Sequence, residues 1–337
     1  MLTAEEGRSE RPLVVVLHWG DLARTADCVA SLMAQQTPLD LLLIDNGGSP
    51  PSVEQLRAMA PGAEVLRSDE NLGVAGGRNL GLHRAVEEGR IWVLLFDNDA
   101  IAAPDMVAAL LHAAAGRPSA ALFGPKILDV DEPSRLVRAG GGSWRRNYLS
   151  SAGELSRKLG RFLPAPLEQH LDDSRGEGRP DDGRFDAAVE AGFITGGAQL
   201  IRVAALREVG LLDPEFSPYG GEDIEFCARL EQAGWQRIYV PEARCFHPGP
   251  GSYRDPYRRA YYNTRNMLLL ARKRLGAAEF YGRYLPDLLL FTLPLKFTHA
   301  ALLGSNEQLR GIRDALAWTV RDAQQRGLRI GTQPPRD

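Results

Sequence analysis

The chain has 337 residues, of which 44% are hydrophobic and 25% are charged, and its formal net charge is -3. A chain of this length and ordinary globular composition can bury a sizeable core in one α/β domain with an appendage. The nearly neutral charge argues against nucleic acid as a partner. The three cysteines are far apart and form no CxxC pair, which favours a reducing, cytosolic setting and excludes a zinc knuckle.

The two kinds of segment that would direct a chain to a membrane are not apparent. The N-terminal stretch MLTAEEGRSERP is acidic and lacks an apolar core, so we expect no signal peptide there. No run of 18 uncharged apolar residues occurs, which argues against a conventional membrane span. The expected location is therefore the cytoplasm, with the inner face of the cell membrane as a peripheral alternative.

Apolar runs and helical patterns alternate along the first 130 residues. Buried strands are expected in PLVVVLHWG, LDLLLIDNGGSP, AEVLRSDE, RIWVLLFDND and AALFGPKIL, and helices in LARTADCVASLMAQQ, in the segment after the glycines at 76 and 77, and in PDMVAALLHAAAG. This rhythm predicts a mostly parallel sheet with helices on both faces. Ligands of such sheets bind beyond the carboxyl ends of the strands, so we expect one site that gathers His18, Asp45, Asn71 and residues 97–99.

The second half of the chain changes character twice. Residues 150–187 are rich in charge, glycine and proline, and they are predicted to form either a solvated insertion or a lid or acceptor loop. Order returns with VEAGFITGGAQLIRVAALREVGLLDPEF. A helix that begins near Glu222 follows, and then a strand that ends in a Gly-Pro turn around His247. From Arg254 onward the pattern is helical and basic.

The run IWVLLFDNDA places two carboxylates, Asp97 and Asp99, directly after a buried strand. A divalent cation would turn their mutual repulsion into shared attraction, and carboxylate oxygens suit magnesium or manganese. Asp-Asn-Asp is also good turn and helix-cap chemistry, which is the structural alternative. A phosphatase of the haloacid-dehalogenase type fits less well, because Ile101 occupies the fifth position of its DxDx(T/V) pattern.

Three further motifs carry groups that could serve a ligand. NLGVAGGRNLG offers two amide side chains and a backbone that a ligand can approach, but it does not have the dinucleotide spacing and a plain turn explains it as well. In YGGEDIEF a helix begins with Glu222 and Asp223, which can project into a cleft or only complement the helix dipole. His247 in CFHPGPG is either structural or an imidazole metal ligand.

Together, these motifs resemble the family 2 inverting glycosyltransferases, and most closely their bacterial rhamnosyltransferase-like branch. The resemblance covers roughly residues 12–275 and includes VVVLHWGDLARTADCVASLMAQQ, LLLIDNGGS, ENLGVAGGRNLGL, WVLLFDNDA, FITGGAQLIRVAALREVGLLDPEF and YYNTRNMLLLARK. It also includes SPYGGEDIEFCARLEQAGW and YVPEARCFHPGPGS. The resemblance implies a GT-A fold, with a Rossmann-like nucleotide-binding half and an acceptor half around one sheet. We expect this catalytic domain at residues 12–253 and a helical C-terminal extension at 254–337.

The resemblance also implies roles for individual residues. Asp223 would be the catalytic base, and Asp99 and His247 would hold Mn²⁺ or Mg²⁺. The expected acceptor-binding residues are Glu222, Gly196 and Gly197. The expected nucleotide-sugar-binding residues are His18, Trp19, Asp45, Asn71, Gly73, Gly76, Asn79, Asp97 and Asn98. His18, Trp19 and Gly20 depart from the Tyr-Asn turn that is common in the family, which leaves the contact with the base open.

The expected reaction is transfer of a sugar from a nucleoside-diphosphate sugar to an acceptor hydroxyl with inversion. The resemblance favours dTDP-rhamnose as donor, followed by UDP-hexoses or galactofuranose. A polysaccharide or other glycan, a lipid-linked glycan or a small natural product fits as acceptor. The rival hypothesis is a nucleotide-sugar- or glycan-binding module that kept the fold and lost turnover, although a pure binder has no need of Asp223.

The segment from Arg254 to Arg283 carries eight Lys and Arg residues against two acidic residues. It is followed by the mostly apolar YLPDLLLFTLPLKFTHAALLG. Such a combination can lie on an anionic bilayer surface. A helical cap on the catalytic domain or a homodimer interface explains it equally well.

Overall fold

The computed structural model describes residues 10–48, 50–151, 176–218, 220–248, 255–327 and 330. The chain separates into two compact units. The sheet unit comprises Met1–Gly141, Arg175–Pro218 and Glu222–Gly249, and the helical unit comprises Gly142–Ser174, Tyr219–Gly221 and Pro250–Asp337. The division at residues 253 and 254 that the sequence suggested stays a prediction.

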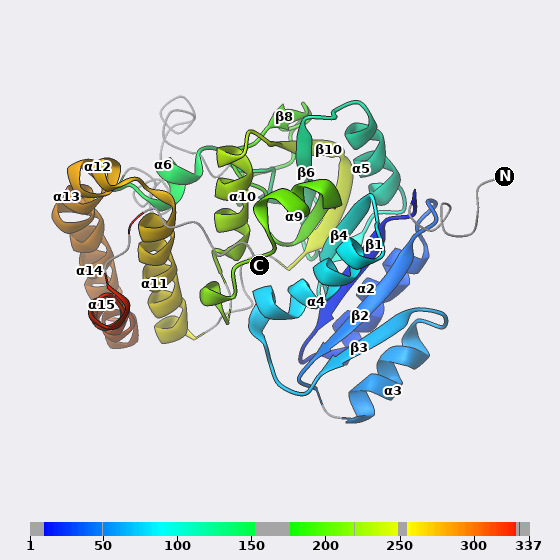
Figure 1. Cartoon of the computed structure of the whole chain (residues 1–337), viewed down its shortest axis with the longest axis horizontal. Helices are drawn as coiled ribbons and strands as arrows, with labels where there is room; N and C mark the ends of the chain where they lie inside the picture. The colour runs from blue at the N-terminus through cyan, green and yellow to red at the C-terminus, as the bar shows by residue number, and fades with distance from the viewer. Residues whose placement is uncertain are drawn as a thin grey trace. The chain divides into compact units, whose positions relative to one another are not determined.

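The sheet unit alternates strands and helices along the chain (Figure 1). Its first part contains β1 (Leu13–His18), α2 (Leu22–Met33), β2 (Asp40–Asn46), α3 (Pro50–Met59), β3 (Glu64–Ser68), α4 (Gly73–Glu87), β4 (Trp92–Asp97), β5 (Ile101–Ala102), α5 (Met106–Ala115), β6 (Ala120–Asp129) and β7 (Leu136–Arg138). Its later part contains β8 (Val189–Glu190), β9 (Ala198–Arg202), α9 (Val203–Val209), η2 (Pro214–Phe216), α10 (Glu222–Gln232) and β10 (Gln236–His247).

The strands of the described residues form one ten-stranded sheet in the order β3-β2-β1-β4-β9-β6-β10-β5, with β7 on β6 and β8 on β10. The strands β3, β2, β1 and β4 run parallel, as do β6 and β10. β9 pairs antiparallel with both β4 and β6 and so joins the two parallel blocks. The mostly parallel sheet predicted from the sequence is confirmed.

Helices cover both faces of this sheet because both faces of β1 are apolar. Val14 and Val16 belong to the core cluster that also contains Cys28 of α2 and Met106 of α5. On the other face, α4 lies so close to β1 that a Cβ on Gly81 would come within 2.5 Å of Val15. This glycine in the middle of α4 therefore allows the helix to pack closely against β1.

The helical unit contains α6 (Trp144–Tyr148), α11 (Pro256–Arg274), α12 (Ala277–Glu279), η4 (Phe280–Tyr284), α13 (Leu285–Asp287), η5 (Leu288–Thr292), α14 (Leu293–Leu302) and α15 (Asn306–Arg326). The segments from α12 to α14 follow one another without a break, and η4 and η5 are π-helical turns. The long helices α11 and α15 pack against each other. No helix among the described residues is long and apolar enough to cross a membrane.

One helix of the sheet unit was not anticipated, and one predicted segment is only partly described. No helix was predicted at α3, because two prolines and a low apolar content hide its short amphipathic pattern. Most of the stretch predicted as an insertion or lid lies outside the described residues. Its end is anchored, because buried Lys126 of β6 pairs with Asp181, at 2.7 Å, and with Asp186.

Candidate active site

The polar ends of three parallel strands meet at one edge of the sheet. β1 pairs with β2 on one side and with β4 on the other. In this register His18 lies opposite Asp45, and Leu17 lies opposite Asp97. The carboxyl ends of parallel strands form the usual ligand crevice of such sheets.

An acidic cluster with one imidazole lies at the end of β4. One ligand atom from each of Asp97, Asp99 and His247 falls within 4.8 Å of the others. His247 Nε2 lies 3.1 Å from Asp99 and 3.6 Å from Asp97. The short strand β5 explains this meeting, because it pairs antiparallel with β10 and sets Ile101 opposite Phe246.

The charges of this cluster depend on one another. Burial would lower the pKa of His247, but hydrogen bonds and charge from Asp97 and Asp99 outweigh it and raise this pKa to about 10. Burial would raise the pKa of Asp97, but Arg78 and then His247 hold it below the ordinary value of an aspartate. Two carboxylates and an imidazole are suitable donors for a manganese or magnesium ion. A metal needs the neutral imidazole, so the proton on His247 would have to leave.

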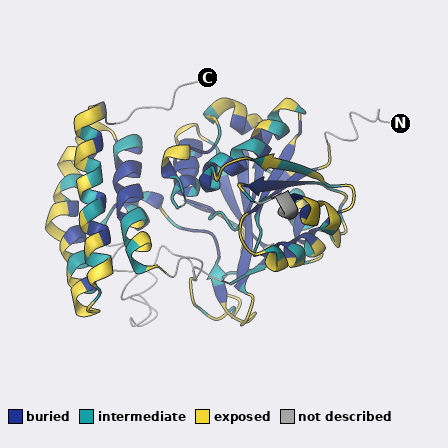
Figure 2. Ribbon diagram, turned by 90° about the horizontal axis from the view of Figure 1, so that it is seen from below, coloured by how far each residue is buried: buried dark blue, intermediate teal, exposed yellow. Residues whose placement is uncertain are grey.

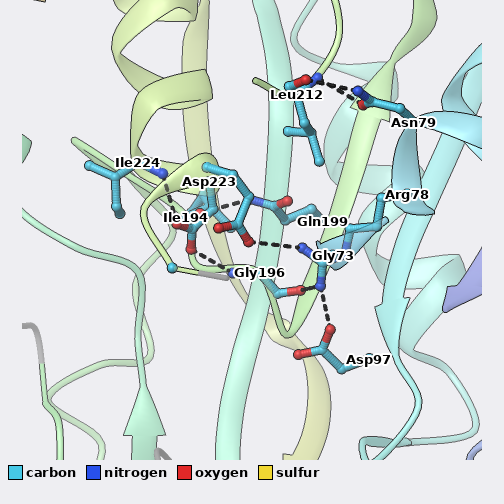
Figure 3. A network of polar contacts seen from close by, with 12 residues as sticks. Gly73, Arg78, Asn79, Asp97, Ile194, Gly196, Gln199, Leu212, Asp223 and Ile224 are labelled. Carbon is cyan, nitrogen blue, oxygen red and sulfur yellow. Dashed lines mark hydrogen bonds and ion pairs between the residues drawn. The ribbon is translucent and has the colours of Figure 1, made fainter. Parts of the chain in front are cut away.

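Arg78 of α4 connects this cluster to a second carboxylate region (Figure 3). Its side chain is 5% exposed, and one guanidinium nitrogen donates to Asp97 and to the Gly196 carbonyl oxygen, the latter at 2.9 Å. Its other terminal nitrogen lies 3.7 Å from Glu222. Arg78 was not among the predicted site residues. The available signal was a cation on the same helical face as Leu82 and Ala85, both of which are buried.

Gly196 joins the two regions through its own backbone. Its carbonyl oxygen accepts from Arg78, and its N–H donates to an oxygen of Asp223 at 3.0 Å (Figure 3). A Cβ at this position would lie 2.9 Å from a guanidinium nitrogen, so a larger residue would push Arg78 away. Asp223, in the first turn of α10, also accepts from the N–H of Ile224 at 2.8 Å.

Asp223 has the opposite electrostatic environment to Asp97. Burial raises the pKa of Asp223 above the ordinary value, and the Ile224 hydrogen bond and the Arg78 charge offset this only in part. A carboxylate that holds a proton more tightly is a better proton acceptor once it is ionised. Glu222, the residue before Asp223, is also buried. Gly197, the other glycine predicted on the acceptor side, lies close to His247, because a Cβ on it would lie 3.9 Å from the His247 ring.

The hydroxyl group of Thr25 contacts two residues that were predicted to bind the nucleotide sugar, His18 at the end of β1 and Asn98 after β4. Thr25 Oγ1 lies 2.9 Å from His18 Nδ1 and accepts from the Asn98 amide at 2.9 Å. His18 is buried, and this burial lowers its pKa, while Trp19 next to it is 64% exposed. Trp19 is therefore the side chain of this turn that is open to solvent.

The β2 end and the glycine segment also come together. Asp45 is fully buried and accepts from the N–H of Gly48 at 2.8 Å. Asn46 donates to Asn71, at 3.2 Å, and to the carbonyl oxygen of Gly73, at 3.1 Å. Gly73 has a positive φ of 71°, and a Cβ there would clash with Ser217 at 2.6 Å.

For two of the residues predicted to bind the nucleotide sugar, the geometry gives no support. Both ends of the Asn79 amide bond the backbone of Leu212, at 2.8 and 3.0 Å, so this side chain fastens α4 to a neighbouring loop. A Cβ on Gly76 would lie 2.9 Å from Leu72, a contact within its own helix start. These two residues remain predictions.

Two protein-family models match the chain. One, described as glycosyl transferase family 2, matches residues 14–162, and another, described as glycosyl transferase family group 2, matches residues 179–320. The chain is also 28% identical over 251 residues to an N-acetylglucosaminyl-diphospho-decaprenol L-rhamnosyltransferase of Mycobacterium tuberculosis, covering 68% of this chain and 73% of that protein. It is 36% identical over 156 residues to the galactofuranosyltransferase GlfT1 of the same species, covering 44% of this chain and 49% of GlfT1.

Solved structures share the fold at low sequence identity. The structure of GalNAc-T7 with UDP, GalNAc and Mn²⁺ matches with a TM-score of 0.55 and 16% identity, over 97% of this chain and 59% of that chain. The mannosyltransferase PcManGT from Pyrobaculum calidifontis, in complex with GDP-Man and Mn²⁺, matches with a TM-score of 0.51 and 15% identity, over 95% and 87% of the two chains. The predicted GT-A fold is thereby confirmed.

Proposed function

Because this chain belongs to glycosyltransferase family 2 and is a sugar-transferring enzyme, we propose that it moves a sugar from a nucleoside-diphosphate donor to an acceptor hydroxyl with inversion. Asp223 is the proposed base, and Asp97, Asp99 and His247 form the proposed metal site. Trp19, Asp45 and the segment Asn71–Gly73 are proposed to contact the nucleotide.

The observation that carries this proposal is that one residue, Gly196, connects the region of Asp97 to the region of Asp223. Gly196 accepts from Arg78, which pairs with Asp97, and donates to Asp223 at 3.0 Å. A base and a leaving-group site must lie on either side of the anomeric carbon for an in-line displacement. A network that fixes Asp97 and Asp223 through one backbone unit holds these two groups at a constant separation.

The steps assigned to the chain's own residues are proton transfer and positioning. Asp223 accepts the proton of the acceptor hydroxyl as its oxygen attacks, because an aspartate is too weak a base to remove that proton beforehand. Glu222 and the Gly196–Gly197 backbone line the proposed acceptor side. A Mn²⁺ or Mg²⁺ ion held by Asp97, Asp99 and His247 would supply positive charge beside the departing diphosphate.

The names of the relatives suggest donors and acceptors to test first. One relative is named as an L-rhamnosyltransferase acting on a diphospho-decaprenol lipid, and another as a galactofuranosyltransferase. We propose dTDP-rhamnose as the first donor, UDP-galactofuranose and UDP-hexoses as the next, and a lipid-linked glycan as the acceptor class.

The experiment that tests the base assignment compares wild type with Asp223→Asn. A thermal-shift screen of nucleotide sugars with manganese first identifies the donor that binds. The variant should bind this donor as wild type does, while transfer falls by about 10²–10⁴-fold, the usual worth of general-base help. Transfer by the variant at the wild-type rate would show that Asp223 is not the base. Nuclear magnetic resonance of the product's anomeric proton would test separately whether the configuration is inverted.

A further inference from the structure

Exposed apolar side chains of the described residues concentrate in one short stretch of the helical unit. Eleven large hydrophobic side chains are exposed in the described part of the chain, and six of them lie between residues 281 and 303. These six are Tyr281, Leu289, Leu290, Phe291, Leu302 and Leu303, of which Leu302 is 82% exposed. Large apolar patches on a protein surface mark sites of interaction with another apolar surface.

The burial pattern of this stretch separates an inner from an outer side. Tyr284, Leu288, Thr292 and Ala300 are buried and recur at multiples of four residues along the run from η4 to α14. Two residues beyond positions 284, 288, 292, 296 and 300 of this series lie Pro286, Leu290, Pro294, Thr298 and Leu302, and all five are exposed. None of the five carries a charge, so the outer side of this helical run is apolar where the solvent-facing side of a helix is normally polar.

We name the segment Phe280–Leu303 the apolar ridge. With about 1.5 Å per helical residue, these residues extend for roughly 35 Å. Figure 2 shows broad exposed stripes along the helices of this unit. No aspartate or glutamate occurs between residues 288 and 306, whereas Lys296 and His299 do.

The charge of the chain is distributed unevenly in a way that selects the partner. Residues 254–337 contain 15 Lys and Arg against 7 Asp and Glu, a net charge of +8. Residues 1–253 contain 25 Lys and Arg against 36 Asp and Glu, a net charge of -11. An apolar surface within a strongly cationic segment suits a partner that is both apolar and anionic.

We propose that the apolar ridge lies on an anionic lipid bilayer surface, with its exposed leucines and Phe291 inserted at the level of the headgroups. Helices that combine an apolar side with surrounding cations bind in the plane of such interfaces. No helix of the described residues is suited to crossing the bilayer, so the contact is peripheral. A second copy of the chain is the less favoured partner, because two helical segments of charge +8 would repel each other.

Vesicle flotation of the full chain tests this inference without any transfer assay. Wild type, Leu290→Glu/Leu302→Glu and the matched control Met33→Glu/Ile91→Glu are mixed with phosphatidylcholine vesicles, with and without phosphatidylglycerol. The control carries the same two new charges at exposed apolar positions of the sheet unit. Melting temperatures near that of wild type establish that each variant is folded.

Wild type and the control should float with the anionic vesicles at low salt, and the ridge variant should bind them at least about tenfold more weakly. Added salt should reduce wild-type binding, because the attraction of the cations is screened. Wild type that fails to float at low salt would overturn the inference, as would equal losses in the ridge variant and the control. Light scattering that shows a wild-type dimer, a monomeric ridge variant and no flotation would assign the ridge to self-association instead.

The inference stands apart from the proposed sugar transfer. If wild type floats but Asp223→Asn transfers sugar at the wild-type rate, only the proposed base is wrong. If wild type does not float but Asp223→Asn loses transfer, only the membrane inference is wrong. A ridge variant that retains transfer to a water-soluble acceptor but loses transfer to a lipid-linked acceptor embedded in vesicles would connect them.

Discussion

Asp97 and Asp223 are two carboxylates in one polar network, yet their surroundings act on them in opposite directions. Asp97 is next to Arg78 and His247, and these cations keep its pKa below the ordinary value of an aspartate. Asp223 receives two backbone N–H groups, no Lys or Arg among the described residues forms an ion pair with it, and its burial raises its pKa. Environments that push the pKa values of two like groups apart separate a permanent anion from a proton acceptor.

The same difference extends to the residues around each carboxylate. The region of Asp97 has several ionic groups, Arg78, Asp99 and His247, and is the proposed metal site. The region of Asp223 is built from the backbone N–H groups of Gly196 and Ile224, which hold the side chain in place and offset only part of the effect of burial on its pKa. The expected consequences of substitutions therefore differ in kind between the two regions.

The largest effect is expected for Asp99→Ala. This change removes one of the three proposed metal ligands, and loss of an outer-shell partner alone typically costs about 10–100-fold in metal affinity. We expect Mn²⁺ binding, measured by calorimetry, to weaken by more than about 100-fold, and transfer to lose its response to added metal. Asp105→Ala is the control, because Asp105 is an exposed aspartate nearby whose side chain caps no helix. Equal metal dependence in Asp99→Ala and wild type would contradict the metal assignment.

A large loss of stability is expected for Arg78→Ala, the change that removes the link between the two regions. It leaves Asp97 and buried Glu222 without their shared cation, and breaking a buried ion pair from one side typically costs about 3–5 kcal/mol. Urea unfolding measures the loss. Arg78→Lys should give an intermediate value, because a single ammonium group replaces the fork whose two terminal nitrogens face Asp97 and Glu222.

The control for this change is Arg84→Ala on the same helix. Arg84 pairs with Glu64 at a partly exposed position, where such pairs are worth about 0–1 kcal/mol. Similar losses for Arg78→Ala and Arg84→Ala would mean that the central link contributes no more than a surface ion pair.

Asp97 and Asp99 were predicted as site residues and Arg78 was not. This difference shows which features of the site the sequence alone can reveal. Strand periodicity and polar residues after each strand predict the sheet and the edge where His18, Asp45 and Asp97 gather, because these are local patterns. The approach of His247 to Asp99 depends on the two-residue strand β5, which has too little sequence to be recognised. It was expected only through the family resemblance.

Arg78 and Gly196 lie 118 residues apart, and nothing local in either position indicates their contact. Asn79 is the opposite case, in which the sequence indicates a ligand contact that the geometry does not support. It is a polar residue in a glycine-rich motif, but its amide forms hydrogen bonds with the backbone of Leu212. Helix α3 was missed because its apolar positions are few. In each case the deciding information is tertiary.

A smaller effect is expected for Trp19→Ala, which tests the donor side alone. The indole is 64% exposed, so its removal should leave the melting temperature unchanged. Stacking of a nucleobase on an aromatic side chain is typically worth about 1–3 kcal/mol, which corresponds to a donor KM raised by about 5- to 150-fold. The turnover number should stay close to wild type, in contrast to Asp223→Asn. Ile91→Ala, which removes another exposed apolar side chain, is the control for the assay. A fall in turnover with an unchanged donor KM would place Trp19 outside the nucleotide site.

The smallest effect is on stability and concerns the sign of the pKa shift at Asp223. Because this pKa is raised in the folded protein, the native state binds more protons than the unfolded state between about pH 3.9 and the folded value. The stability of wild type relative to Asp223→Asn should therefore fall as pH rises through this window and become constant above it. The melting temperatures of both proteins, measured from pH 4 to pH 8, give this difference directly. The amide can replace only one of the two acceptor oxygens used by Gly196 and Ile224, which adds a constant offset without altering the direction of the pH dependence. A difference that rises with pH would mean that Asp223, like Asp97, is held as a permanent anion, and the division between the two carboxylates would then be wrong.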